Sequence, residues 1–141
     1  MKIIVDEIRN DYLMQEFQYN GSNLHSNVYS VRLRVYKHNT PSGTLSVELR
    51  TSGGTLLATS TETRIESDVS GTYWHGMLRF NLAYPLTQGT VYQLRLLDSG
   101  TFSESNYWGW CREFDFVNND KEYTPANDIN MPYMYEIWEK S

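Results

Sequence analysis

Apolar side chains recur at every second position along several short segments of this chain, and this period of two requires an extended backbone. In the segment 91–97, Tyr92, Leu94 and Leu96 alternate with more polar residues, and the segment 28–36 shows the same pattern. Successive side chains of a strand point to opposite faces, so each segment is expected to be a β-strand with one buried face.

Turn-forming residues separate further segments of the same kind. Gly53 and Gly54 predict a tight hairpin turn, and the segment 12–19 fits a strand or a short helix, of which we expect the strand because β-forming residues dominate it. The expected strands cover 3–8, 12–19, 28–36, 44–50, 55–60, 73–83, 91–97, 106–116 and 131–138, and the Thr-rich run up to Ile65 either continues one of them or begins another. Roughly eight to ten short strands with no helical period predict an all-β, jelly-roll-like antiparallel β-sandwich.

The length of 141 residues fits one domain that spans positions 1–141 and can bury a core without disulfides or metals. The inward faces of the expected strands supply that core. They carry Val31, Leu33, Val35, Leu45, Val47, Leu49, Trp74, Leu78, Phe80, Leu82, Tyr92, Leu94 and Leu96.

Charge and cysteine content exclude several classes of protein. The formal net charge is −5 and no basic stripe occurs, so we expect no nucleic-acid partner. Cys111 is the only cysteine in the sequence, so no intrachain disulfide can form. The segment 1–5 is followed at once by acidic residues, which predicts no signal peptide, and no apolar run is long enough to span a membrane. We therefore expect synthesis and folding in a cytoplasm.

Residues able to support catalysis are few. His25, His38 and His75 lie in separate segments without metal-ligand spacing. Glu113 and Asp115 share one strand face, whereas glycosidase carboxylates usually face each other across a cleft. We expect no enzyme activity, no catalytic residue, no cofactor and no metal.

Two further features allow more than one interpretation. The run 117–122 offers oxygen ligands that could hold calcium, but an ordinary turn rich in Asn and Asp is the favoured interpretation. Cys111 shares strand parity with Glu113 and Asp115, and two neighbouring acids would raise the pKa of its thiol, which argues against a nucleophile.

Trp108 and Trp110 stand two residues apart, so their indoles lie on one face of a strand. They either fill the core of the sandwich, as the same parity of Phe114 and Phe116 suggests, or form an exposed strip on which sugar rings stack. Both interpretations stay open at this point. The glycan site predicted by the second comprises Tyr107, Trp108, Trp110, Arg112, Glu113 and Asp115.

Five pieces of sequence carry a resemblance to a known group of domains. They are 39–45, 53–60, 80–82, 85–92 and 105–110. Their order resembles small jelly-roll β-sandwich domains of phage virion proteins and of bacterial surface or secreted proteins, akin to carbohydrate-binding modules. The resemblance covers roughly residues 28–116. It implies a part of a particle surface or a binder of extracellular glycans.

The resemblance and the missing signal peptide together lead us to expect a non-enzymatic phage virion structural protein: a capsid decoration, head-fibre or tail-associated subunit made in the host cytoplasm. We expect its partners to be other virion proteins and further copies of itself, with contact to surface glycans as an additional role. The aromatic segments 12–19 and 131–138 are the expected contact regions. The alternative function is a carbohydrate-binding module that uses the Trp/Tyr platform.

Overall fold

The period-two segments all form strands in the computed structural model, which describes residues 2–19, 27–114, 133 and 135–139. The strands are β1 (Lys2–Glu7), β2 (Tyr12–Gln18), β3 (Asn27–His38), β4 (Leu45–Thr51), β5 (Leu56–Thr59), β6 (Tyr73–Pro85), β7 (Val91–Asp98), β8 (Tyr107–Phe114) and β9 (Tyr135–Glu139). One turn of 3-10 helix, η2 (Glu66–Asp68), lies between β5 and β6.

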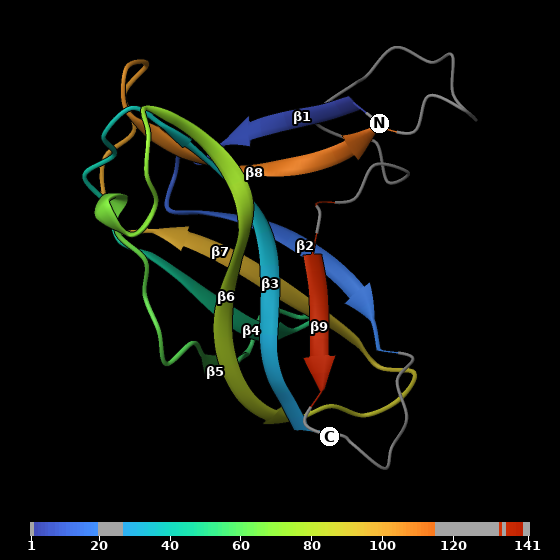
Figure 1. Cartoon of the computed structure of the whole chain (residues 1–141). Helices are drawn as coiled ribbons and strands as arrows, with labels where there is room; N and C mark the ends of the chain where they lie inside the picture. Colours follow the sequence, from blue (N-terminus) through green and yellow to red (C-terminus); the bar gives the residue numbers. More distant parts are fainter. Residues whose placement is uncertain (1, 20–26, 115–132, 134, 140–141) are drawn as a thin grey trace.

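The strands form two antiparallel sheets that pack face to face as a β-sandwich (Figure 1). Sheet A has the order β1-β8-β3-β6, with β9 paired to β3 beyond the end of the β3–β8 pairing, and sheet B has the order β2-β7-β4-β5. The chain thus crosses repeatedly between the sheets, and this strand order is that of a jelly roll built from two Greek keys. The predicted fold class is confirmed.

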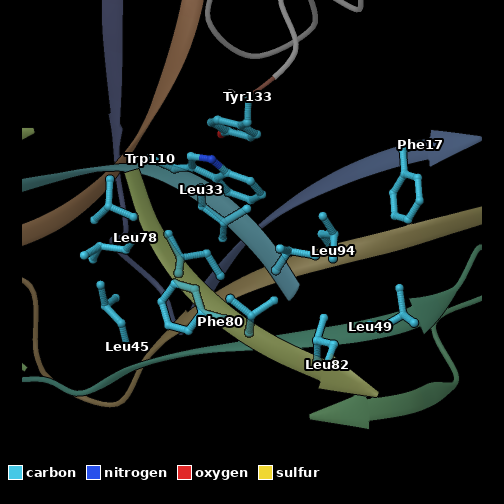
Figure 2. Packing of buried hydrophobic residues seen from close by; sticks show 14 of the residues in the cluster. Phe17, Leu33, Leu45, Leu49, Leu78, Phe80, Leu82, Leu94, Trp110 and Tyr133 are labelled. Atoms are coloured by element: carbon cyan, nitrogen blue, oxygen red, sulfur yellow. The ribbon is translucent and has the colours of Figure 1, made fainter. Parts of the chain in front are cut away.

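The core lies between the two sheets and is built by alternate side chains of β3, β4, β6, β7 and β8 (Figure 2). All of the predicted inward side chains are buried except Trp74, which is half-buried and packs against the core. The β-strand interpretation of 12–19 is also confirmed, because β2 pairs with β7 over its full length.

The run after β5 neither continues that strand nor forms another named strand. Arg64 makes an isolated bridge to Leu45, and its guanidinium donates to the carbonyl of Arg79 at 2.6 Å. Turn η2 follows, where the carboxylate of Asp68 accepts a hydrogen bond from the backbone N–H of Ile65 at 2.7 Å. This segment therefore crosses from sheet B to sheet A as an irregular connection.

Two glycines are required by the backbone. Gly54 has φ +94° in the hairpin between β4 and β5, where its N–H donates to the carbonyl of Thr51 at 2.9 Å. A Cβ on Gly43 would lie 1.6 Å from Oδ1 of Asp98 and 2.4 Å from the backbone nitrogen of Gly100. The loop before β4 can therefore approach the end of β7 only without a side chain at this position.

The aromatic residues of the expected contact regions are largely used by the core. Phe17 and Tyr19 are buried, as is Tyr133, and Phe17 contacts Tyr135 with ring centroids 5.8 Å apart. These buried rings are therefore not available to an outside partner, because β2 and β9 face each other across the sandwich. Residues 131, 132 and 134 lie outside the described residues.

No helix among the described residues is both long and apolar enough to cross a membrane.

Candidate functional site

Strand β8 divides the predicted glycan platform between its two faces. Trp108 and Trp110 point into the sandwich and are 0% exposed, and Nε1 of Trp108 donates to the carbonyl of Gly43 at 3.3 Å. Tyr107 points to the outer surface of sheet A. Of the two interpretations of the tryptophan pair, the structure shows core packing, so the indoles offer no strip for a sugar.

Trp110 packs against Tyr133, which follows the stretch of chain outside the description. Their rings are stacked with centroids 4.5 Å apart and planes 14° apart, and Figure 2 shows the phenol lying over the indole. Burial raises the pKa of the Tyr133 phenol, and the neighbouring Asp6 raises it further. The phenol of Tyr133 is therefore neutral near pH 7. Its stack on Trp110 packs this part of the chain against the core.

Arg112 forms hydrogen bonds with both Asp6 and Tyr133 and so links β1 and β8 to the segment that contains Tyr133. Its Nε donates to Oδ2 of Asp6 at 2.6 Å, its Nη2 donates to the hydroxyl of Tyr133 at 3.1 Å, and that hydroxyl donates to Asp6 at 2.7 Å. The guanidinium also lies 4.2 Å from the centroid of the Tyr133 ring. Because these contacts engage the guanidinium inside the protein, Arg112 is committed to structure rather than to orienting sugar hydroxyls.

The remaining predicted site residues cannot be assigned to a surface. Glu113 lies in β8, paired with Ile3 of β1, but its side chain is outside the description. Asp115 and the run 117–122, interpreted above as an ordinary turn with calcium binding as the alternative, lie outside the described residues altogether.

Tyr107 belongs instead to a cluster of rings on the outer surface of sheet A, which we call the aromatic face. It comprises Tyr36, His38, Tyr73, Phe102 and Tyr107. The imidazole of His38 stacks on Tyr107 with centroids 4.5 Å apart and planes 6° apart, and Tyr73 contacts the other side of this pair, 4.9 Å from His38. The ring of Phe102 lies 5.5 Å from that of Tyr107. Strand register brings these rings together, because His38 pairs with Tyr73 on one side and with Tyr107 on the other.

Polar groups border the aromatic face. The hydroxyl of Tyr36 lies 3.1 Å from Nδ1 of His38, and the guanidinium of Arg9 lies 4.4 Å from the centroid of Phe102. Burial is the main cause that raises the pKa values of Tyr36 and Tyr107, so both phenols are neutral near pH 7. The face thus offers ring surfaces, neutral hydroxyls and a cation at its border.

Tyr73 is the most accessible ring of the aromatic face. It is 67% exposed, and Met77, four residues further along β6 on the same surface, is 37% exposed. His75 lies between them, also outward, with Nδ1 2.8 Å from Nη2 of Arg34. An exposed ring and thioether on one sheet face form a surface that another molecule can cover.

Cys111 lies on the outward side of β8 but is fully buried. Burial raises the pKa of its thiol to about 11, and the nearby Arg34 lowers it only in part. The predicted direction of the shift agrees with the structure, whereas its main cause is burial rather than the two acids we invoked. A buried, protonated thiol is inert as a nucleophile.

Lys37 is a buried charged residue that the sequence pattern did not identify as notable. It follows Val35 on the inward face of β3, and its ammonium group donates to Oε1 of Glu66 at 3.2 Å and to the carbonyl of Val69 at 2.9 Å. A second backbone contact runs to the carbonyl of Glu66 at 3.3 Å. These partners compensate the buried charge and fix turn η2, which gives Lys37 a structural role.

Within the described ranges, no three His, Cys, Asp or Glu side chains are grouped so that they could hold a metal ion. In comparisons with models of protein families, with curated proteins and with solved structures, no match to this chain was found.

The aromatic face was only partly visible in the sequence. The sequence pattern places Tyr107 in the predicted platform, but it does not group Tyr36, His38 and Tyr73 with that residue. The available signal was the outward parity of Tyr36 and His38 along 28–38. That parity groups these rings only once β6 and β8 are known to flank β3, and this neighbourhood is given by the sheet topology rather than by the sequence pattern.

Proposed function

We propose that this chain is a non-enzymatic structural subunit of a phage particle, which acts by packing the aromatic face of sheet A against a neighbouring subunit. The observation that carries the proposal is the 67% exposure of Tyr73 within a cluster of five rings. The jelly-roll strand order supports it as well, because viral capsid proteins are among the users of this architecture. That second support is an analogy of fold.

The composition of the aromatic face suits a protein interface. Tyrosine is enriched at the energetic centres of such interfaces, and Tyr36, Tyr73 and Tyr107 contribute three phenol rings to this face. Tyr73 and Met77 would enter the buried centre of the contact, and Arg9, which already pairs with Glu7 at 2.5 Å, would lie at its rim. A rigid sheet that presents pre-packed rings loses little side-chain freedom on binding.

Footprinting with hydroxyl radicals tests this proposal directly. The isolated chain and gradient-purified particles are oxidised under matched conditions, and modification of Tyr73 and Met77 is measured by peptide mass spectrometry. We expect strong protection of both residues in the particle. Leu56, which is 47% exposed on edge strand β5, serves as the reference position on the other sheet. Equal modification of Tyr73 in both samples would exclude the aromatic face as the contact.

Carbohydrate binding is the second candidate function, and the stacked His38–Tyr107 pair beside the open ring of Tyr73 favours it. A pyranose could lie on Tyr73, with the neutral hydroxyl of Tyr36 at the border. A glycan array with the variants Tyr73→Ala and Tyr73→Phe tests this candidate. It predicts loss of signal with alanine and retention with phenylalanine, and equal signals from both variants would contradict it.

A further inference from the structure

The outer surface of sheet B carries a hollow of about 410 Å³ that takes no part in the aromatic face. Strands β2, β4 and β7 line it, and the side chains that matter are Tyr12, Ser46, Glu48, Arg50 and Arg95. Register explains their meeting, because Glu48 pairs with Arg95, and Tyr12 and Ser46 both pair with Leu97. The volume lies within the range of about 300–1,000 Å³ usual for small-molecule sites.

Tyr12 supplies a ring that is fixed yet accessible. The guanidinium of Arg95 lies 4.3 Å from the ring centroid and covers one face of the phenol. Arg95 is itself held by Oε1 of Gln93, which accepts from its Nε at 3.3 Å and from its Nη2 at 3.2 Å. Even so, Tyr12 stays 41% exposed. The stack therefore orients the ring without closing it off from a ligand.

Glu48 supplies an oriented carboxylate beside that ring. Its Oε1 accepts a hydrogen bond from Nε of Arg50 at 2.9 Å, and Nη2 of the same guanidinium forms an ion pair with it at 2.8 Å. Nη1 of Arg50 is occupied by the carbonyl of Gly54 at 2.7 Å. Among the described residues, Oε2 of Glu48 has no hydrogen-bond partner. The arginine thus fixes the carboxylate and leaves one of its oxygens available to a ligand.

The free polar groups of the hollow include donors and acceptors. Within the described chain, Nη1 of Arg95 and the hydroxyl of Ser46 also have no hydrogen-bond partner. A donor, an acceptor and a hydroxyl beside an exposed ring match a molecule that has one apolar face and several hydroxyl groups. An apolar ligand would leave all three polar groups desolvated and unpaired.

The charges of the hollow favour a neutral ligand. Asp11, Glu48 and Asp98 contribute carboxyl groups, and Arg50 and Arg95 contribute guanidinium groups that are already bonded within the protein. An anion is repelled by the acids and a cation by the arginines, so neither finds a lining of uniformly opposite charge. We propose that this hollow binds one unit of a neutral saccharide, whose ring stacks on Tyr12 and whose hydroxyls bond to Glu48 and Arg95. The site lies on the opposite sheet from both candidate functions above and does not rest on either.

Titration of the full chain with sugars, followed by two-dimensional ¹H–¹⁵N NMR, tests the proposal. Glucose, galactose, mannose, N-acetylglucosamine and their common disaccharides are added to millimolar concentrations. We expect at least one of them to give saturable shifts in the amides of 46–50 and 95–99. Tyr12→Ala and Glu48→Gln should each weaken that binding tenfold or more.

Three variants serve as controls. Tyr12→Phe keeps the ring and Glu16→Gln changes an exposed acid of the same strand outside the hollow, so both should bind as the parent chain does. Tyr73→Ala alters only the aromatic face and should also leave the shifts unchanged. If Tyr73→Ala abolishes the binding instead, the sugar belongs to the aromatic face and the inference fails.

Other outcomes would also overturn the inference. The first is that no sugar gives saturable shifts. The second is that Tyr12→Ala and Glu48→Gln bind the sugar as tightly as the parent chain does, while thermal unfolding shows that both variants are folded. Tighter binding of glucuronate than of glucose would contradict the assignment to a neutral ligand. Footprinting of Tyr73 in particles is independent of all these results, so the two proposals fail separately.

Discussion

The imidazole of His38 lies flat on the phenol of Tyr107, with ring centroids 4.5 Å apart and planes inclined by 6°. The two residues are register partners on β3 and β8, and they occupy the outer surface of sheet A. Trp108, the next residue along β8, points the opposite way into the core. A single aromatic segment therefore serves two purposes, because alternate residues supply the core and the surface.

We predict that Tyr107→Ala lowers the free energy of unfolding by about 1–2 kcal/mol, because it removes stacked contacts with His38 and Phe102. Tyr107→Phe keeps the stack and should change stability by less than about 0.5 kcal/mol. Urea unfolding of both variants measures the difference. Equal losses from both substitutions would show that the hydroxyl matters and the stack does not.

Trp110→Ala should destabilise the chain by about 3–5 kcal/mol, since it empties a fully buried site and removes the partner of Tyr133. The surface variant Tyr73→Ala should lie within about 0.5 kcal/mol of the parent chain. Thermal unfolding compares the two. A Trp110→Ala protein of parental stability would be incompatible with an indole in the core.

Cys111 should resist thiol reagents in the folded protein and react with one equivalent after denaturation, because its side chain is fully buried. The raised pKa also sets a sign for the dependence of stability on pH. The thiol ionises near its ordinary pKa of 9.0 in the unfolded chain and at about 11 in the folded one. Its contribution is thus complete below pH 9.0 and is lost as the pH rises to about 11.

The comparison with Cys111→Ala isolates this effect from the tyrosines that ionise in the same range. The stability difference between the parent chain and the variant should move in favour of the variant as the pH rises from 8 to 11. A difference that stays constant over this range would mean that the thiol has the same pKa in both states.

Gly43→Ala should lower the free energy of unfolding by about 3 kcal/mol or more, because the new methyl group would overlap the carboxylate of Asp98 and the backbone nitrogen of Gly100. Gly53→Ala is the matched control, since its Cβ would meet only Oγ1 of Thr51 at 3.8 Å. We expect Gly53→Ala to change stability by less than about 1 kcal/mol. If urea unfolding shows that both substitutions lower the free energy of unfolding equally, the close approach of the Gly43 loop to β7 is not essential for stability.

The strands and the core were largely predictable from the sequence. The period-two pattern is local, so Val31, Leu33 and Val35 could be assigned to a buried face without any knowledge of their partners. The inward position of Lys37 follows from the same parity. Its burial could not be foreseen, because the carbonyls that receive its ammonium group come from an irregular turn about thirty residues away along the chain.

The sites were harder to predict, because each depends on which strands are neighbours. Tyr36 and Tyr73 come together through the pairing of β3 with β6, and Tyr12 and Glu48 meet because both their strands flank β7. The spacing of Trp108 and Trp110 placed them on one face but could not say which. Burial of that face is decided by the opposing sheet, which is assembled from residues distant in the sequence.

The most direct test of the proposed particle role is quantitative mass spectrometry of gradient-purified phage particles from the source culture, with copies of this chain counted per major capsid subunit. Our proposal predicts a fixed ratio that stays constant across the particle peak of the gradient. The absence of the chain from the particles, or an amount that does not follow the particle peak, would contradict it.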